Sequence, residues 1–92
     1  MYYLVCYDIS DDRIRYRVVK VLKGVGVRIQ KSVFECAELT EKQFLDLKDR
    51  LEALIDHTGD SIYYIRLCRS CCKEVEWSGL GRKPQIESFR VV

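Results

Sequence analysis

The strongest constraint on the fold is the order in which two kinds of apolar pattern alternate along the chain. Residues 2–8 and 61–68 combine aromatic and β-branched residues over lengths typical of strands buried on both faces. Between them, two segments carry apolar residues at helical spacing: Ile14, Val18, Val21, Leu22 and Val25, then Phe44, Leu47, Leu51, Leu54 and Ile55. Strand and helix therefore alternate, with roughly 30 residues in each β-α-β half.

Both helices have recognisable end signals. Ser10, Asp11 and Asp12 supply an N-cap candidate and first-turn acids, and either Gly24 or Gly26 could take the left-handed conformation after the helix. Thr40 and Gln43 form a capping box at the start of the second helix. We expect this helix to end near residues 57–59.

Further strands are expected around these helices. Residues 27–37 are strand-like, and Lys31 with Ser32 could be a hairpin turn or the middle of one bent strand. A short alternating strand at 74–78 and a last strand at 86–92 follow. The order fits an α+β fold, a ferredoxin-like βαββαβ sandwich with both helices on one face of an antiparallel sheet and an extra C-terminal strand.

The surplus strand predicts assembly. We assign residues 1–80 to the ferredoxin-like domain and residues 81–92 to a C-terminal segment and strand for contact with a partner chain. A strand that arrives after the sandwich is complete must pair with an open sheet edge, its own or a partner's. We therefore predict a two-fold homodimer, and leave open whether the last strand pairs within its own subunit or across the dimer.

Composition excludes several classes of protein. The 92 residues, of which 48% are hydrophobic and 33% charged, suit one globular domain rather than a disordered or fibrous chain. No apolar run approaches the roughly 18 residues of a membrane span, so no membrane partner is expected. Five cysteines without a secretory leader predict reduced thiols and a cytoplasmic location.

Charge is segregated along the chain although the net charge is only +2. Residues 13–34 contain seven bases and no acid, whereas residues 35–60 contain eight acids against three bases. One face should therefore be positive and another negative, which suits docking on a polyanion. Two well-solvated helices would explain the same pattern.

Asp8 is the best single candidate for a functional side chain. It closes an apolar strand directly before a helix, where loops expose active groups at a sheet edge. The alternative is a capping or turn residue of that helix. As a Mg²⁺ ligand it would need waters or a second carboxylate, which a nearby two-fold axis would supply.

Basic residues form a stripe on the first helix. Arg13, Arg17 and Lys20 lie at i, i+4 and i+7, Arg15 lies on the opposite flank, and Arg28 on the next strand could extend the patch. Arginines at a helix start oppose its dipole, so Arg13 and Arg15 need another reason, of which phosphate contact is the natural one. The alternative is a solvated face paired with Asp11 and Asp12.

The cysteines leave a question open. The run containing Cys68, Cys71 and Cys72 holds one C-x-x-C motif, which is half of a zinc site or a redox pair, and the other half is missing. The sequence contains no glycine-rich phosphate loop, and no Ser-His-Asp or Cys-His arrangement can be assembled with any specificity.

Two blocks together carry a resemblance to a known family. The runs YDISDD-RIRYR at residues 7–17 and RIQKSVFE at residues 28–35, joined by a helix that ends in glycine, strongly resemble the small CRISPR-associated proteins of spacer acquisition, described as metal-dependent endoribonucleases. The similarity extends over essentially the whole chain. The C-R-S-C-C cluster does not belong to the pattern of that family.

The resemblance implies a ferredoxin-like homodimer in which Asp8 binds Mg²⁺ or Mn²⁺ near the two-fold axis. It also implies catalytic roles for Asp8 and Tyr7, and roles in nucleic-acid binding or cleavage for Arg15, Arg17, Arg28 and Phe34. The expected partners are the CRISPR integrase subunit, which the segment 81–92 would contact if it does not serve the dimer, protospacer DNA and single-stranded RNA.

Two functions follow as hypotheses. The first is a metal-dependent endonuclease that hydrolyses phosphodiester bonds through Asp8. The second is a scaffold without nuclease activity that bridges integrase dimers and holds DNA on its basic surface.

Overall fold

The computed structural model describes residues 1–72, 74, 76 and 78. Its elements alternate as the sequence predicts, with a third, short helix added at the end. The strands are β1 (Tyr2–Asp8), β2 (Val27–Gln30), β3 (Val33–Cys36) and β4 (Ser61–Leu67). The helices are α1 (Asp12–Lys23), α2 (Glu41–Leu54) and α3 (Arg69–Cys72). Lys31 and Ser32 form the turn between β2 and β3, which decides between the two predicted possibilities in favour of a hairpin.

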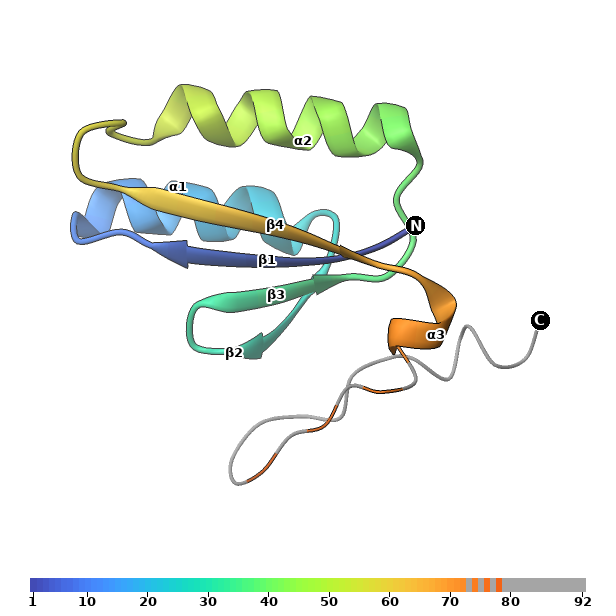
Figure 1. The fold of residues 1–92 in the computed structure, drawn as a ribbon. Helices are drawn as coiled ribbons and strands as arrows, with labels where there is room; N and C mark the ends of the chain where they lie inside the picture. The colour runs from blue at the N-terminus through green and yellow to red at the C-terminus, as the bar shows by residue number, and fades with distance from the viewer. Residues whose placement is uncertain (73, 75, 77, 79–92) are drawn as a thin grey trace.

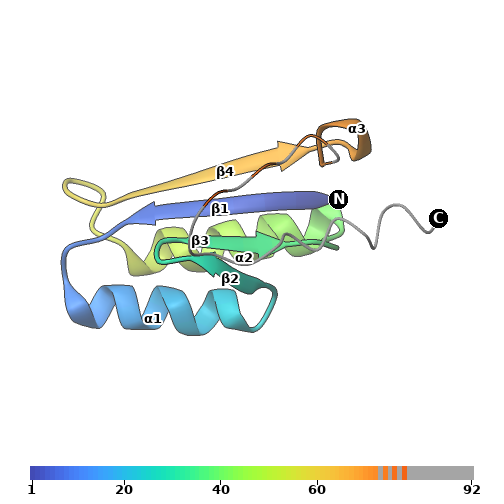
Figure 2. The same cartoon turned by 90° about the horizontal axis from the view of Figure 1, so that it is seen from below.

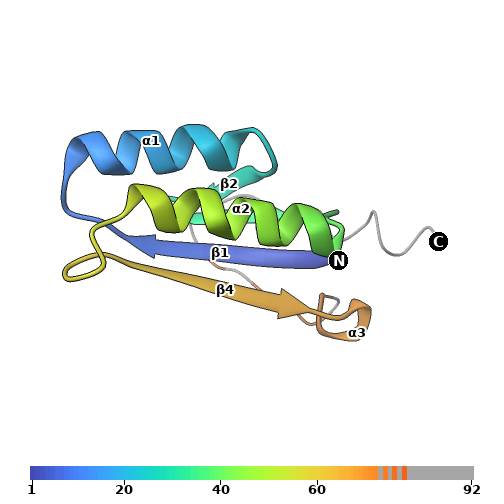
Figure 3. The ribbon, with the colours of Figure 1, turned by 90° about the horizontal axis from the view of Figure 1, so that it is seen from above.

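The four strands form one antiparallel sheet in the order β2-β3-β1-β4. Both long helices cover one face of this sheet and lie side by side (Figures 1 and 3). The predicted α+β ferredoxin-like architecture is thus confirmed. The predicted strand at 74–78 depends on residues 75 and 77, which lie outside the described residues, as do the strand at 86–92 and the boundary at residue 81.

The core lies between the sheet and the two helices. Val5 of β1, Phe34 of β3 and Leu51 of α2 are completely buried there. Tyr3 stacks on Phe44 with ring centroids 4.1 Å apart, and Phe44 meets Tyr64 edge to face at 5.6 Å. Because alternate residues of a strand point to opposite faces, the core takes one side of β1 and leaves Asp8 on the other.

The helix ends confirm one prediction and correct two. The capping box of α2 is formed, with Gln43 N–H donating to Thr40 Oγ1 at 3.1 Å and Thr40 N–H donating to Gln43 Oε1 at 2.9 Å. The helix ends at Leu54, earlier than predicted, because Ile55 is already extended. The sequence suggested that either Gly24 or Gly26 could be a left-handed cap, but Gly24 is right-handed with φ −74° and Gly26 does not lie in the left-handed region.

Gly26 is required for another reason. A Cβ at this position would lie 2.4 Å from the Glu35 carbonyl oxygen and 2.8 Å from Cys36 Sγ. The chain therefore has to pass close to β3 as it leaves α1, and only a residue without a side chain fits there.

The second face of the sheet corrects a further prediction. β4 was expected to be buried on both faces, yet Tyr63 is 66% exposed and Ile65 43% exposed. Within the described part of the chain β4 is an edge strand, and Figure 2 shows the sheet from the side that carries neither long helix. No helix of the described residues is long and apolar enough to cross a membrane.

Candidate functional site

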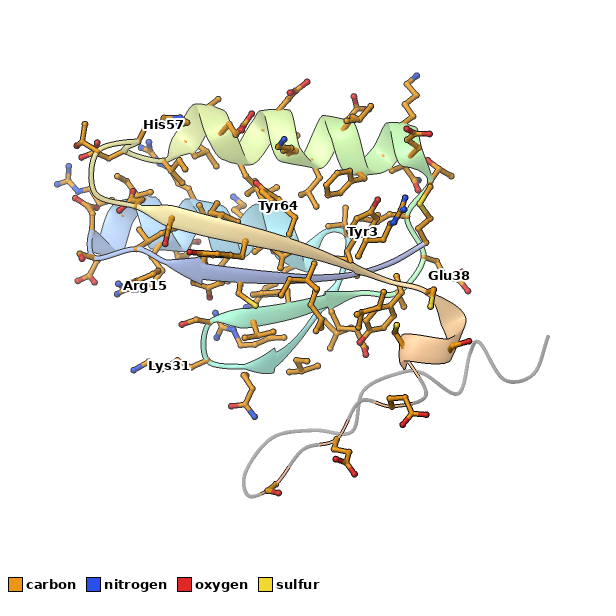
Figure 4. All side chains as sticks on the ribbon, viewed as in Figure 1. Tyr3, Arg15, Lys31, Glu38, His57 and Tyr64 are labelled. Atoms are coloured by element: carbon orange, nitrogen blue, oxygen red, sulfur yellow. The ribbon has the colours of Figure 1, made fainter. Side chains whose placement is uncertain are left out.

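A groove with a volume of about 820 Å³ opens where β1 ends, α1 begins and the β2–β3 turn approaches both. Figure 4 shows Arg15 and Lys31 at this end of the molecule and Glu38 at the opposite end. The groove is lined by a mixture of basic, acidic and aromatic side chains. Those used below are Tyr7, Asp8, Asp12, Arg15, Tyr16, Lys20, Lys23, Arg28 and Lys31.

Asp8 lines the groove and is exposed. It is not the cap of α1: that cap is Asp11, whose Oδ1 accepts from the backbone N–H groups of Arg13 at 2.8 Å and Ile14 at 3.1 Å. Within the described residues the Asp8 carboxylate makes no hydrogen bond or ion pair. Capping of α1, the alternative role considered for Asp8, is therefore performed by Asp11.

Arg15 holds the loop between Asp8 and α1. Its Nη1 donates to the carbonyl oxygens of Ile9 at 2.9 Å and Ser10 at 3.4 Å, and its Nη2 forms an ion pair with Asp12. This explains why an arginine near the helix start is tolerated against the helix dipole. The alternative to phosphate contact, a pairing with the first-turn acids, is thus observed for Arg15 with Asp12. The Arg15 side chain is nevertheless half-exposed and lines the groove.

Tyr7, Arg28 and Phe34 form a second cluster beside the groove. The Tyr7 hydroxyl donates to the Lys31 carbonyl oxygen at 3.1 Å and accepts from Arg28 Nη2 at 3.5 Å. The Arg28 guanidinium carbon lies 5.4 Å from the centroid of the Phe34 ring, a cation–π arrangement. Tyr7 and Phe34 thus position the Arg28 guanidinium at the groove.

Burial separates the roles within this cluster. Phe34 is completely buried and Tyr7 is 5% exposed, whereas Arg28 is exposed. In this structure the Phe34 ring therefore has no free face for a nucleotide, and it supports Arg28 instead. The Tyr7 hydroxyl is likewise engaged with the β2–β3 turn.

The predicted basic stripe adjoins the groove. Arg13, Arg17 and Lys20 line a shallower depression of about 530 Å³ on α1, and this depression shares Asp12, Tyr16 and Lys20 with the main groove. These three cations have no acidic partner within the described residues. All the predicted basic residues are thus brought to one continuous surface.

Sequence reasoning missed four contributors to this surface. Lys23, Lys31 and Asp12 line the groove, and Tyr16 lies at the junction of both depressions with 68% of its surface exposed. A signal for Tyr16 was present, because it stands between Arg15 and Arg17 on the polar side of the helix. An exposed aromatic ring among cations is a platform on which a base can stack.

The donor set for a divalent cation is small. Asp8 and Asp12 are the carboxylates of the groove, and Asp12 is already paired with Arg15. No group of three metal-ligating side chains exists among the described residues. Mg²⁺ commonly binds through one or two carboxylates and several waters, so Asp8 fits a Mg²⁺ or Mn²⁺ ion but does not enclose it.

Comparison with known proteins identifies relatives over most of the chain. The family model described as CRISPR associated protein Cas2 matches residues 1–75. A CRISPR-associated endoribonuclease Cas2 of Chloroflexus aurantiacus is 42% identical over 86 residues, which cover 92% of this chain and 91% of the relative.

Two solved structures show the same fold. Cas2 of Streptococcus pyogenes superposes with a TM-score of 0.77 at 36% identity, covering 86% of this chain and all of that one. A chain of a partial Cas6-RT-Cas1–Cas2 complex superposes with a TM-score of 0.71 at 26% identity, covering 82% of this chain and 81% of that one.

Proposed function

The chain belongs to the CRISPR-associated Cas2 family, and from this premise we propose that it is a nucleic-acid-binding homodimer of spacer acquisition and a metal-dependent endonuclease. One observation carries the proposal: Asp8, an exposed carboxylate with no hydrogen bond or ion pair to the described residues, lies in a groove lined by five basic side chains. This combination suits a phosphodiester, because the cations attract its negative charge and the carboxylate would hold the metal ion used in its hydrolysis.

The basic side chains account for binding. Arg28 is held from beneath by Tyr7 and Phe34, and Arg15 is held by the loop carbonyls, so two guanidinium groups are ordered before any ligand arrives. Ordered donors lose less conformational entropy on binding. The lysines of the groove are exposed and add charge without fixed direction. Protospacer DNA and single-stranded RNA both present the phosphates that this surface would bind.

Asp8 is the residue that would hold Mg²⁺ or Mn²⁺. The ion, when bound, lowers the pKa of a coordinated water and offsets the charge that develops on the phosphate. The chain's own contribution would be to present a carboxylate that no other described residue hydrogen-bonds, and to hold the flanking phosphates on Arg15 and Arg28.

The open face of the sheet supports the homodimer. Tyr63, Ile65 and Val27 are exposed on or beside this face, and Leu4 and Cys6 lie on it by strand alternation. A second copy docked there would bury apolar surface and bring a second Asp8 toward the first. One carboxylate per chain is a sparse site, and a two-fold pair would supply the usual two.

The integrase subunit Cas1 is the proposed partner. One structural neighbour is part of a complex that contains Cas1 and Cas2. A scaffold that holds DNA between integrase subunits would need the basic groove but no metal, and the neighbour's place in a complex with Cas1 favours this second function. The proposed setting for either function is the cytoplasm.

Cleavage assays separate the two functions. Labelled single-stranded RNA and double-stranded DNA are incubated with Mg²⁺, Mn²⁺ or EDTA and with the parent, Asp8→Ala or the control Asp49→Ala. Asp49 is an exposed acid of α2, outside the groove lining. The nuclease predicts metal-dependent cleavage by the parent and Asp49→Ala, and none by Asp8→Ala.

Binding is measured on the same proteins without turnover. Cleavage by Asp8→Ala at the parental rate would contradict the nuclease proposal. If no variant cuts while all of them bind DNA, the scaffold function is favoured. If neither the parent nor the variants bind nucleic acid at moderate salt, both the nuclease and the scaffold function are contradicted, because each requires the basic groove.

A further inference from the structure

Two thiols lie at the end of the sheet that is remote from the groove. Cys68 follows directly after β4, and Cys71 lies in α3, on the opposite side of the molecule from the end of β1 (Figure 1). β4 itself spans the distance, since Ser61 pairs with Asp8 and Leu67 pairs with Tyr2. Seven residues of strand separate the sites by roughly 20 Å. The pair is therefore independent of the proposed nucleic-acid site.

The geometry brings the two sulfur atoms together. Cys68 Sγ lies 3.4 Å from Cys71 Sγ, and the backbone N–H of Cys71 donates to Cys68 Sγ at 3.4 Å. Both residues are exposed, and both are free thiols in this structure. A disulfide bond of about 2.05 Å needs an approach of little more than an ångström, which side-chain rotation can supply.

We propose that Cys68 and Cys71 are a redox modification site, a dithiol that converts reversibly to an intramolecular disulfide by exchange with low-molecular-weight disulfides such as oxidised glutathione. The Cys68 thiolate attacks one sulfur of the glutathione disulfide, forms a mixed disulfide and releases one glutathione thiolate. Cys71 then loses its proton to solvent and attacks Cys68 Sγ, which releases the second glutathione. Two protein thiols are oxidised and one disulfide is reduced to two thiols.

The surroundings assign the two roles. Hydrogen bonds from the backbone N–H and the thiol of Cys71 lower the pKa of Cys68, whereas its contact with Cys68 raises the pKa of Cys71. Cys68 is thus the attacking thiol and Cys71 the resolving one. The remaining described cysteines differ: burial raises the pKa of Cys6, and burial with the Glu35 charge raises the pKa of Cys36 to about 11.

The short spacing determines what the disulfide does. It closes a ring over only four residues, so it restricts the unfolded chain little and adds little global stability. Its effect is local, at the point where the chain leaves β4. An exposed disulfide in a small ring is also readily reduced, as a reversible modification requires.

Mass spectrometry after oxidation tests the proposal on the full-length chain. The reduced protein is incubated with oxidised glutathione, quenched with acid and alkylated, and its disulfides are mapped by peptide. The parent and the control Cys72→Ser should each lose about 2 Da as one Cys68–Cys71 disulfide forms, and should regain it with dithiothreitol. The double variant Cys71→Ser/Cys72→Ser lacks a resolving thiol nearby and should accumulate the mixed disulfide at Cys68.

Alkylation of the reduced protein gives a second readout. With limiting iodoacetamide at neutral pH, Cys68 should react roughly tenfold faster than Cys6 or Cys36, because it is exposed and has the lower pKa. Three results would overturn the proposal: a disulfide that uses Cys72 in the parent, no intramolecular disulfide at any glutathione ratio, or tightly retained zinc that leaves both thiols unreactive.

Discussion

Replacing Tyr7 with Phe removes one hydroxyl that serves two parts of the groove at once. That hydroxyl donates to the Lys31 carbonyl oxygen at 3.1 Å and accepts from Arg28 Nη2 at 3.5 Å. The ring stays in place, so its contact with Phe34, at 6.3 Å between centroids, is retained. The substitution therefore tests the hydrogen bonds separately from the packing of the core.

The expected magnitude follows from these two contacts. The bond to the carbonyl has good length and should contribute about 1 kcal/mol, while the longer bond to Arg28 adds little stability. For a domain of this size such a loss lowers the melting temperature by about 4–8 °C. Releasing the Arg28 side chain should weaken nucleic-acid binding about two- to tenfold, the effect of ordering one long side chain.

Thermal melting and binding titrations over a range of salt concentrations measure both effects. Tyr3→Phe is the matched control: Tyr3 is equally buried on the same face of β1, and the one hydrogen bond of its hydroxyl to the part of the chain that the structure describes is a weak one to Met1 Sδ, at 3.6 Å. This control should melt and bind like the parent. Because Tyr7→Phe retains every charge, the slope of log affinity against log salt should not change, whereas Arg28→Gln should reduce it by about 1.

Two results would refute this reasoning. Equal melting temperatures for Tyr7→Phe and the parent would mean that the hydroxyl bridge contributes nothing to the fold. A large fall in kcat with unchanged affinity would support the catalytic role that the family resemblance implies for Tyr7. It would contradict the role argued from its burial, which is to position Arg28.

The remaining predictions concern the fold. Leu51→Ala should lower the free energy of unfolding by about 2–5 kcal/mol in urea denaturation, because Leu51 is completely buried, and an unchanged midpoint would contradict the packing of α2. Gly26→Ala should lose about 1–3 kcal/mol, since its Cβ would lie 2.4 Å from the Glu35 carbonyl oxygen, whereas Gly59→Ala, with open space around it, should not show this loss. The free energy of unfolding should fall as pH rises from about 9 to about 11, because burial raises the pKa of Cys36 from 9.0 to about 11. In this range the folded state retains the proton that the unfolded state releases. Denaturation measured at each pH should show a flatter dependence for Cys36→Ala.

Much of the fold was predictable because its signals are local. The period of the apolar residues identified α1 and α2, and the capping box at Thr40 and Gln43 marked the start of α2 to the residue. Asp8 was singled out as a candidate from its place at the end of a strand, and the structure places it, exposed, in the groove. In each case the deciding interactions lie within a few residues of one another in the sequence.

The errors arose where distant segments meet. Tyr63 has the composition of a buried strand residue, and its exposure follows from the edge position of β4, which depends on sheet order. Gly26 was interpreted as a helix cap, although β3, ten residues away, is what requires it. The contact of Phe34 with Arg28 was not foreseen for the same reason, because it is the pairing of β2 with β3 that places Arg28 over the Phe34 ring.

The sequence by itself thus determined the succession of strands and helices, the capping box of α2, the separation of charge and the resemblance to a family, since periodicity, N-terminal capping and charge are properties of neighbouring residues. The tertiary structure decided which side chains share a site. It joined Asp8, Arg15 and Arg28 in one groove and placed Tyr7 and Phe34 against Arg28. Such proximity depends on how the strands are ordered and how the chain turns, and no spacing of residues along the sequence specifies it.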